Sequence, residues 1–217
     1  MRYLEHRCEQ MQKLGASVET IDGDAAQELS GSPAYRHGGI LDSTAGTIHP
    51  LNYAYGLAQA AAAQGARLYQ QSPLERLLRQ DNHWLAETEK GRVTAEQVVI
   101  ATNAYADDRS QGVQESTLPV FIFQCATAAL PPAVANSIIP QRHGLWDTRT
   151  LMTSSRVDRE GRLVMSSAGN LRSFHRPIRS NWMMRLRNRL YPQARGIPWA
   201  YHWTRYGDGQ ASRRYAR

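Results

Sequence analysis

A helix followed directly by a strand, near the middle of the chain, restricts the fold more than any other feature. His49-Pro50 opens an alanine-rich stretch that ends at Gly65. Proline near the start and glycine just past the end are the usual punctuation of a helix. Residues 66–72 then predict a strand, which implies that the alanine-rich face of the helix packs against a sheet.

The next residues predict three more strands. Two short alternating runs, 83–88 and 92–95, flank the turn Glu89-Lys90-Gly91 and indicate a β-hairpin. The run Val98–Ala101 is almost continuously apolar, which is typical of a strand buried on both faces of a parallel sheet. Helix, strand, hairpin and buried strand together predict an α/β domain.

The two flanking regions have different patterns. Residues 2–14 place apolar side chains at helical spacing, and Gly15 can end that helix. From residue 116 onward, runs such as 117–127 and 161–167 predict a mostly antiparallel layer. Residues 176–192 then predict an amphipathic helix that ends at proline.

The positive net charge of +7 comes from one part of the chain. Residues 171–217 contain 11 arginines and a single acidic residue, whereas residues 1–170 are slightly acidic. Arginine interleaved with aromatic side chains can bind single-stranded nucleic acid. A basic nucleic-acid-binding or interaction module is therefore the alternative function, although a solvated helix face explains the same arginines. Its candidate stacking residues are Trp182, Tyr191, Trp199, Tyr201 and Trp203.

Other classes of protein are not indicated. Cys8 and Cys125 lie far apart without a ligand pattern, so neither a metal site nor a disulfide framework is expected. No stretch is apolar enough for a membrane span, and the charged start does not resemble a signal peptide. The sequence therefore favours a cytoplasmic protein with no membrane partner.

The central segments resemble a known family. The run from Gly38 to Tyr69, the SPLERL segment that begins at Ser72 and the VVIATNAY segment that ends at Tyr105 occur in this order. They resemble FAD-dependent oxidoreductases of the D-amino-acid-oxidase and glycine-oxidase superfamily, nearest the gamma-glutamylputrescine oxidoreductase type. The resemblance spans roughly residues 2–203.

This resemblance implies a mixed α/β (α+β) fold. It would combine a partial FAD/NAD(P)-binding parallel sheet carrying the β-hairpin with a mostly antiparallel substrate domain with helices. The implied organisation begins with a substrate-domain portion at residues 1–38 and a partial FAD-binding domain at residues 39–112. The main substrate domain follows at residues 113–203, and a disordered basic tail at residues 204–217.

The family activity is oxidation of an amine or amino acid to an imine by FAD. The resemblance places Leu74 at a strand end facing the adenine, His49 at a helix start near the flavin, and Ala101, Thr102 and Asn103 in a turn that approaches the dinucleotide. A polar residue that ends a parallel strand lies where such sheets bind ligands, which supports Asn103. A lone histidine before a helix is more often a cap.

The same resemblance places Trp146, Asp147 and Arg156 toward the substrate pocket. An arginine there suits a substrate carboxylate, which it can bind bidentately. Hydride removal to a flavin needs orientation and desolvation more than an acid–base pair, so no catalytic residue is assigned. The partner is a small-molecule amine or amino acid, and its identity, the electron acceptor and the oligomeric state stay open.

Departures from the family pattern are equally specific. No G-x-G-x-x-G turn opens a helix, and Gly207-Asp208-Gly209 has no strand before it. The resemblance stops at Trp203, which suggests a frameshifted tail. Ser155 and Ser166 stand where an aromatic residue and a glycine are frequent. We therefore expect an incomplete, inactive fragment that does not retain FAD alone.

Overall fold

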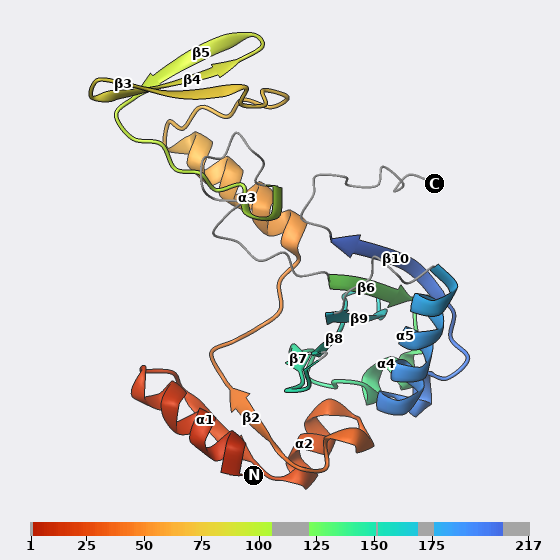
Figure 1. Ribbon diagram of the computed structural model, residues 1–217. Helices are drawn as coiled ribbons and strands as arrows, with labels where there is room; N and C mark the ends of the chain where they lie inside the picture. The colour runs from red at the N-terminus through yellow and green to blue at the C-terminus, as the bar shows by residue number, and fades with distance from the viewer. Residues whose placement is uncertain (1, 106–121, 151, 169–175, 206–217) are drawn as a thin grey trace. The chain divides into compact units, whose positions relative to one another are not determined.

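The computed structural model describes residues 2–105, 122–150, 152–168 and 176–205. These residues belong to two compact units (Figure 1). Unit 1 contains residues 1–47 and 121–205, and unit 2 contains residues 48–120 and 206–217. The sequence placed the corresponding boundaries at residues 39 and 113.

Unit 1 begins with a small layer of its own. Helix α1 (Arg2–Lys13) packs on strand β1 (Val18–Ile21), which pairs antiparallel with β2 (Gly39–Asp42). Between these strands lie α2 (Gly23–Ser30) and the 3₁₀ turn η1 (Pro33–Tyr35). Asp22 caps α2 by accepting a hydrogen bond from the Ala25 amide, as an N-cap carboxylate does for an otherwise unpaired helix donor.

Gly31 fixes this layer to the rest of unit 1. It ends α2 in the left-handed conformation, with φ of 63°. A Cβ at this position would lie 1.9 Å from the Ser137 carbonyl oxygen, so only glycine permits the contact. The Ile139 amide donates to the Ser30 carbonyl over 3.1 Å, and Gln193 Nε2 donates to the Gly31 carbonyl over 2.7 Å.

A five-stranded antiparallel sheet forms the body of unit 1. Its order is β10-β6-β9-β8-β7, and these strands lie side by side in Figure 1. The strands are β6 (Ile122–Thr127), β7 (Leu145–Trp146), β8 (Thr153–Val157), β9 (Leu163–Ala168) and β10 (Trp199–Arg205). Strand β10 thus extends two residues into the predicted tail, and the rest of that tail lies outside the described residues.

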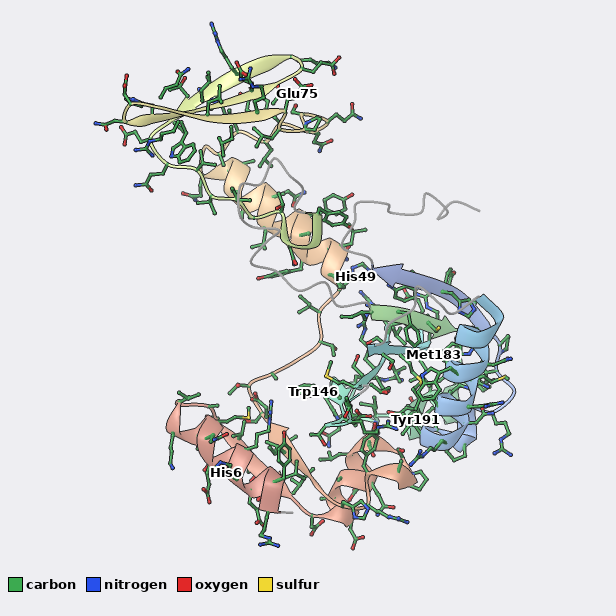
Figure 2. All side chains as sticks on the ribbon, viewed as in Figure 1. His6, His49, Glu75, Trp146, Met183 and Tyr191 are labelled. Atoms are coloured by element: carbon green, nitrogen blue, oxygen red, sulfur yellow. The ribbon has the colours of Figure 1, made fainter. Side chains whose placement is uncertain are left out.

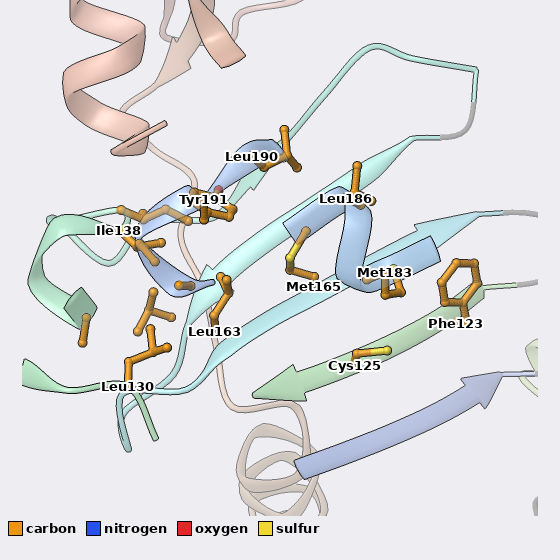
Figure 3. Close-up of a cluster of buried hydrophobic side chains, with 14 residues drawn as sticks. Phe123, Cys125, Leu130, Ile138, Leu163, Met165, Met183, Leu186, Leu190 and Tyr191 are labelled. Atoms are coloured by element: carbon orange, nitrogen blue, oxygen red, sulfur yellow. The ribbon is translucent and has the colours of Figure 1, made fainter. Parts of the chain in front are cut away.

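Helices cover one face of this sheet. They are α4 (Pro132–Ser137), α5 (Arg176–Leu190) and the 3₁₀ turn η3 (Pro192–Ala194). Figure 3 shows the core that they enclose, in which Met183, Leu186 and Leu190 face Leu163 and Met165 of the sheet. Alternate residues of β6, β8 and β9 therefore point into this core, and their neighbours point to the opposite face.

The described part of unit 2 contains one α-helix and one small sheet. Helix α3 (Pro50–Ala63) starts at the predicted proline. Strands β3 (Arg76–Gln80), β4 (His83–Thr88) and β5 (Gly91–Ala95) form an antiparallel sheet in that order. The predicted hairpin is present as β4 and β5, and η2 (Asn103–Tyr105) follows. The sequence did not predict β3 as the third strand.

The described residues do not contain the predicted parallel sheet. Residues 66–72 and 97–101 contain no strand, and every strand pair within the described residues is antiparallel. Apolar sequence alone does not make a parallel strand, because its amides and carbonyls need a neighbouring strand. Consistent with this, Val99 is 88% exposed.

Candidate functional site

The face of the large sheet that the helices leave uncovered, which we call the open face, carries a continuous cross-strand row. Pairing connects Trp146 of β7 to Ser154 of β8, Ser154 to Ser166 of β9, and Ser166 to Gln124 of β6. Gln124 in turn pairs with Trp203 of β10. Directly paired residues project from the same face of a sheet, so these five side chains form one row across all five strands.

Arg156 lies on the same face, two residues along β8 from Ser154. Residues two apart on a strand share a face and are separated by roughly 6.6 Å. The structure therefore brings together two of the three predicted substrate residues, Trp146 and Arg156. Trp146 is 57% exposed, and Figure 2 labels it on β7.

Asp147 has a different environment. Its carboxylate is mostly buried and accepts the Thr153 amide over 3.0 Å, the Arg149 amide over 3.2 Å and Arg149 Nε over 2.7 Å. These bonds close the turn between β7 and β8. Asp147 thus holds the turn that follows Trp146, and contact between Asp147 and a substrate stays a prediction.

The arginines of this region differ in how they are paired. Arg162 forms ion pairs with Asp158 and Glu160, and its guanidinium lies 5.4 Å from the centroid of the Tyr201 ring. The hydrogen bond that Arg162 donates to the Asp158 carboxylate raises the pKa of Arg162. Arg156 has neither an ion pair nor a hydrogen-bond partner within the described part of the chain. Its charge is therefore available to an anionic ligand.

The row also contains hydroxyl and amide groups that the sequence did not identify as site residues. Ser154 Oγ and Ser166 Oγ lie 2.5 Å apart and share one hydrogen bond. Gln124 is half-buried, and among the described residues its side chain has no hydrogen-bond partner. Only strand register places these residues beside Trp146 and Trp203, so no local sequence signal could have found them.

The predicted FAD residues lie in unit 2, in separate loops. His49 caps α3, since its Nδ1 accepts the Asn52 amide over 3.2 Å. Leu74 precedes β3, whereas Ala101, Thr102 and Asn103 follow β5 and are exposed. Asn103 has a φ of 49°, a left-handed conformation that asparagine tolerates. Contacts of these five residues with a dinucleotide stay predictions.

The residues of the alternative nucleic-acid function are divided between core and surface. Tyr191 is fully buried, and the Arg187 side chain is buried with its guanidinium 5.2 Å from the Trp199 ring. Arg187 also donates to the Ile197 carbonyl, and burial lowers its pKa. These side chains are components of the core, so they cannot stack on bases. Trp182, which is 45% exposed, stays on the surface.

Comparison with known proteins decides the family. The family described as "FAD dependent oxidoreductase" (DAO) matches residues 1–209. The chain belongs to this FAD-dependent oxidoreductase family. The predicted mixed α/β class with antiparallel strands and helices, and the FAD cofactor class of the family, are thereby confirmed.

Two curated relatives give the same result. "Probable oxidoreductase OrdL" of Haemophilus influenzae is 31% identical over 193 residues, which are 87% of this chain and 43% of the relative. "Gamma-glutamylputrescine oxidoreductase" of Escherichia coli is 28% identical over 208 residues, which are 93% of this chain and 47% of the relative. The chain thus spans about half the length of the curated relatives it matches.

Solved structures share the fold. Glycine oxidase from Geobacillus kaustophilus superposes with a TM-score of 0.70 at 20% identity, over 94% of this chain and 54% of the other. The amino acid oxidase NikD superposes with a TM-score of 0.61 at 14% identity, over 93% and 55%.

The described residues show few features of other classes of site. No helix among them is long and apolar enough to cross a membrane. They also contain no group of three or more histidine, cysteine, aspartate or glutamate residues that could hold a metal ion.

Proposed function

We propose that this chain supplies the substrate-binding sheet for FAD-dependent oxidation of a C–N bond in an amine or amino acid. The observation that carries the proposal is the open face of unit 1, where Arg156, unpaired among the described residues, lies beside the row from Trp146 to Trp203. Arg156 would bind the carboxylate of the substrate, and the row would orient the rest of the molecule. The relatives named for oxidoreductase activity support this assignment.

The described residues of unit 2 do not by themselves fit a complete dinucleotide. The turn at Ala101–Asn103 offers exposed backbone, and the start of α3 is already capped by His49. No glycine-rich turn precedes that helix, although such a turn lets the backbone approach a pyrophosphate. A bound flavin would accept the hydride. The residues of this chain would hold and orient the substrate.

A chimera tests the proposal. It joins residues 2–205 of this chain to the part of the Haemophilus influenzae relative that they do not match. We expect the chimera to bind FAD and an amine or amino acid to bleach the flavin absorbance anaerobically. Arg156→Met should slow this bleaching for substrates with a carboxylate, whereas Arg185→Met, an exposed arginine on α5, should not. A flavin-loaded chimera that no C–N substrate reduces would refute the proposed function.

A further inference from the structure

The helix-covered face of the large sheet brings a thiol and an imidazole together. Strand register pairs Cys125 of β6 with His202 of β10, and Cys125 Sγ lies 3.3 Å from His202 Nδ1. Cys125 is 3% exposed, and Figure 3 shows it within the core cluster. His202, in contrast, is exposed. The pair therefore joins a buried nucleophile to a base that solvent can reach.

The contact between these two groups favours the reactive form of the cysteine. When the imidazole carries its proton on Nε2, Nδ1 of His202 accepts the thiol proton of Cys125. After the proton has moved, the imidazolium Nδ1–H donates back to the thiolate. The thiolate, and not the thiol, is the nucleophile. A neighbouring imidazole is one of the groups that activate a cysteine in this way.

A third side chain orients the imidazole. The rings of Trp199 and His202 meet edge to face, with centroids 6.4 Å apart and an angle of 61° between their planes. Trp199 itself packs against the core cluster, and the Arg187 guanidinium lies 5.2 Å from its ring centroid. Edge-to-face contacts favour one relative orientation of two rings. A nucleophile, an adjacent base and a group that orients the base form the general arrangement of an activated nucleophile.

Access to the sulfur restricts what can react with it. Because Cys125 is almost fully buried, a bulky electrophile cannot approach it. His202 lies on β10, the edge strand of the sheet, and the register of β10 is shifted between Trp199 and Tyr201. Such an irregularity disrupts the hydrogen-bond ladder locally. This edge suits entry of a small neutral oxidant with two heavy atoms, such as hydrogen peroxide.

We propose that Cys125 and His202 form a peroxide-sensitive thiol site in which Cys125 is oxidised to a sulfenic acid. His202 takes the thiol proton, and the thiolate sulfur attacks one oxygen of hydrogen peroxide. The O–O bond breaks as the S–O bond forms, and the leaving hydroxide takes the proton from His202 and departs as water. Sulfur loses two electrons and peroxide gains them. The site depends neither on a flavin nor on the proposed function.

Cys8 provides a matched reference within the same chain. It is 4% exposed, and both cysteines are free. Cys8 Sγ donates to the Val18 carbonyl over 3.7 Å, and a carbonyl oxygen does not take up a thiol proton. The two cysteines thus have equal burial, and they differ in whether a base lies beside the sulfur.

The size of the expected difference follows from the chemistry of thiols. An ordinary thiol is about 3% ionised at pH 7. Complete ionisation raises the thiolate population by up to about 30-fold, but the lower nucleophilicity of a more acidic thiol reduces the gain to about three-fold. Protonation of the leaving oxygen by His202 adds to this, since acid assistance typically contributes about 100-fold or more. We therefore expect Cys125 to be oxidised at least about ten-fold faster than Cys8.

A time course with hydrogen peroxide tests the proposal on the full chain at pH 7. Samples are quenched in denaturant with excess iodoacetamide, and mass spectrometry quantifies the unoxidised Cys8 and Cys125 peptides. Dimedone added to parallel samples identifies the sulfenic acid. His202→Asn should lower the oxidation rate of Cys125 to within about three-fold of the rate of Cys8. His83→Asn, at an exposed position on β4, should change neither rate.

The comparison of Cys125 with Cys8 needs no variant, so it decides even if a substitution disturbs folding. A circular dichroism spectrum checks each variant, and His202→Phe replaces His202→Asn if the latter does not fold. Equal oxidation rates of the two cysteines would overturn the proposal. An unchanged or faster oxidation of Cys125 without His202 would overturn it as well, because opening of β10 would then control the reaction. Oxidation of Cys125 without a dimedone adduct would exclude the sulfenic acid.

Discussion

Leu163 offers the sharpest test of where the stability of this chain resides. Its side chain is fully buried in the core cluster between the sheet and α5 (Figure 3). Leu163→Ala removes three buried carbons, and comparable core substitutions cost about 3 to 5 kcal/mol because the cavity collapses only partially. A domain is stable by about 5 to 15 kcal/mol. The substitution should therefore remove about a fifth or more of the free energy of unfolding of unit 1.

The matched control is Leu57→Ala on α3. Leu57 is 54% exposed, and none of the residues of that helix is buried. The change should alter the free energy of unfolding by no more than about 0.5 kcal/mol. Leu163→Met provides a second control, since a volume-conserving change in a core costs less than about 1.5 kcal/mol.

Urea unfolding followed by tryptophan fluorescence and far-ultraviolet circular dichroism measures these differences. With a slope of about 1 to 3 kcal/mol per molar urea, a loss of about 3 kcal/mol lowers the unfolding midpoint by roughly 1 to 3 M. The reasoning is refuted if Leu163→Ala costs less than about 1 kcal/mol. Equal costs for Leu163→Ala and Leu57→Ala would refute it as well, because they would show that the two units do not differ in packing.

Three further predictions concern other parts of the chain. Gly31→Ala should destabilise unit 1 by more than about 1 kcal/mol in urea unfolding, because the new Cβ meets the Ser137 carbonyl and the backbone is left-handed; an unchanged midpoint would contradict the Gly31 contact. Burial raises the pKa of Tyr191 to about 12, so the unfolded chain loses the phenol proton at lower pH than the folded chain does. The free energy of unfolding should therefore fall as pH rises from 10 to 12. Tyr191→Phe should reduce this pH dependence, and an identical pH profile for the variant would contradict the prediction. The purified chain should not retain FAD, because the residues predicted to contact the dinucleotide lie in separate loops and all but Leu74 are exposed. Stoichiometric flavin absorbance after gel filtration would show otherwise.

Sequence reasoning succeeded where structure is decided locally. The turn Glu89-Lys90-Gly91 predicted the hairpin, and Pro50 marked the first residue of α3. Both signals depend on residues within one turn of each other. The strand predicted at Val98–Ala101 is absent, because a strand needs a hydrogen-bonded neighbour and its own composition does not supply one.

The candidate site was predictable only in part for the same reason. Family resemblance pointed to Trp146 and Arg156, which do share the open face. Gln124 and Ser166 are 42 residues apart, and only the register between β6 and β9 makes them neighbours. A shift of that register by one residue would turn each side chain to the opposite face. Such long-range pairing leaves no trace in a single sequence.

The contrast between the two units has a consequence for how function can be measured. Helix α3 is rich in alanine, and it exposes Leu51, Tyr53 and Tyr55 as well as Leu57. A helix that is apolar on every side is normally enclosed by other elements, and the described residues do not enclose this one. Unit 1, in contrast, has both a closed core and the open face. Substrate recognition should therefore be measurable on unit 1 within the full chain even when unit 2 holds no flavin, so a lack of turnover would not by itself argue against the substrate site.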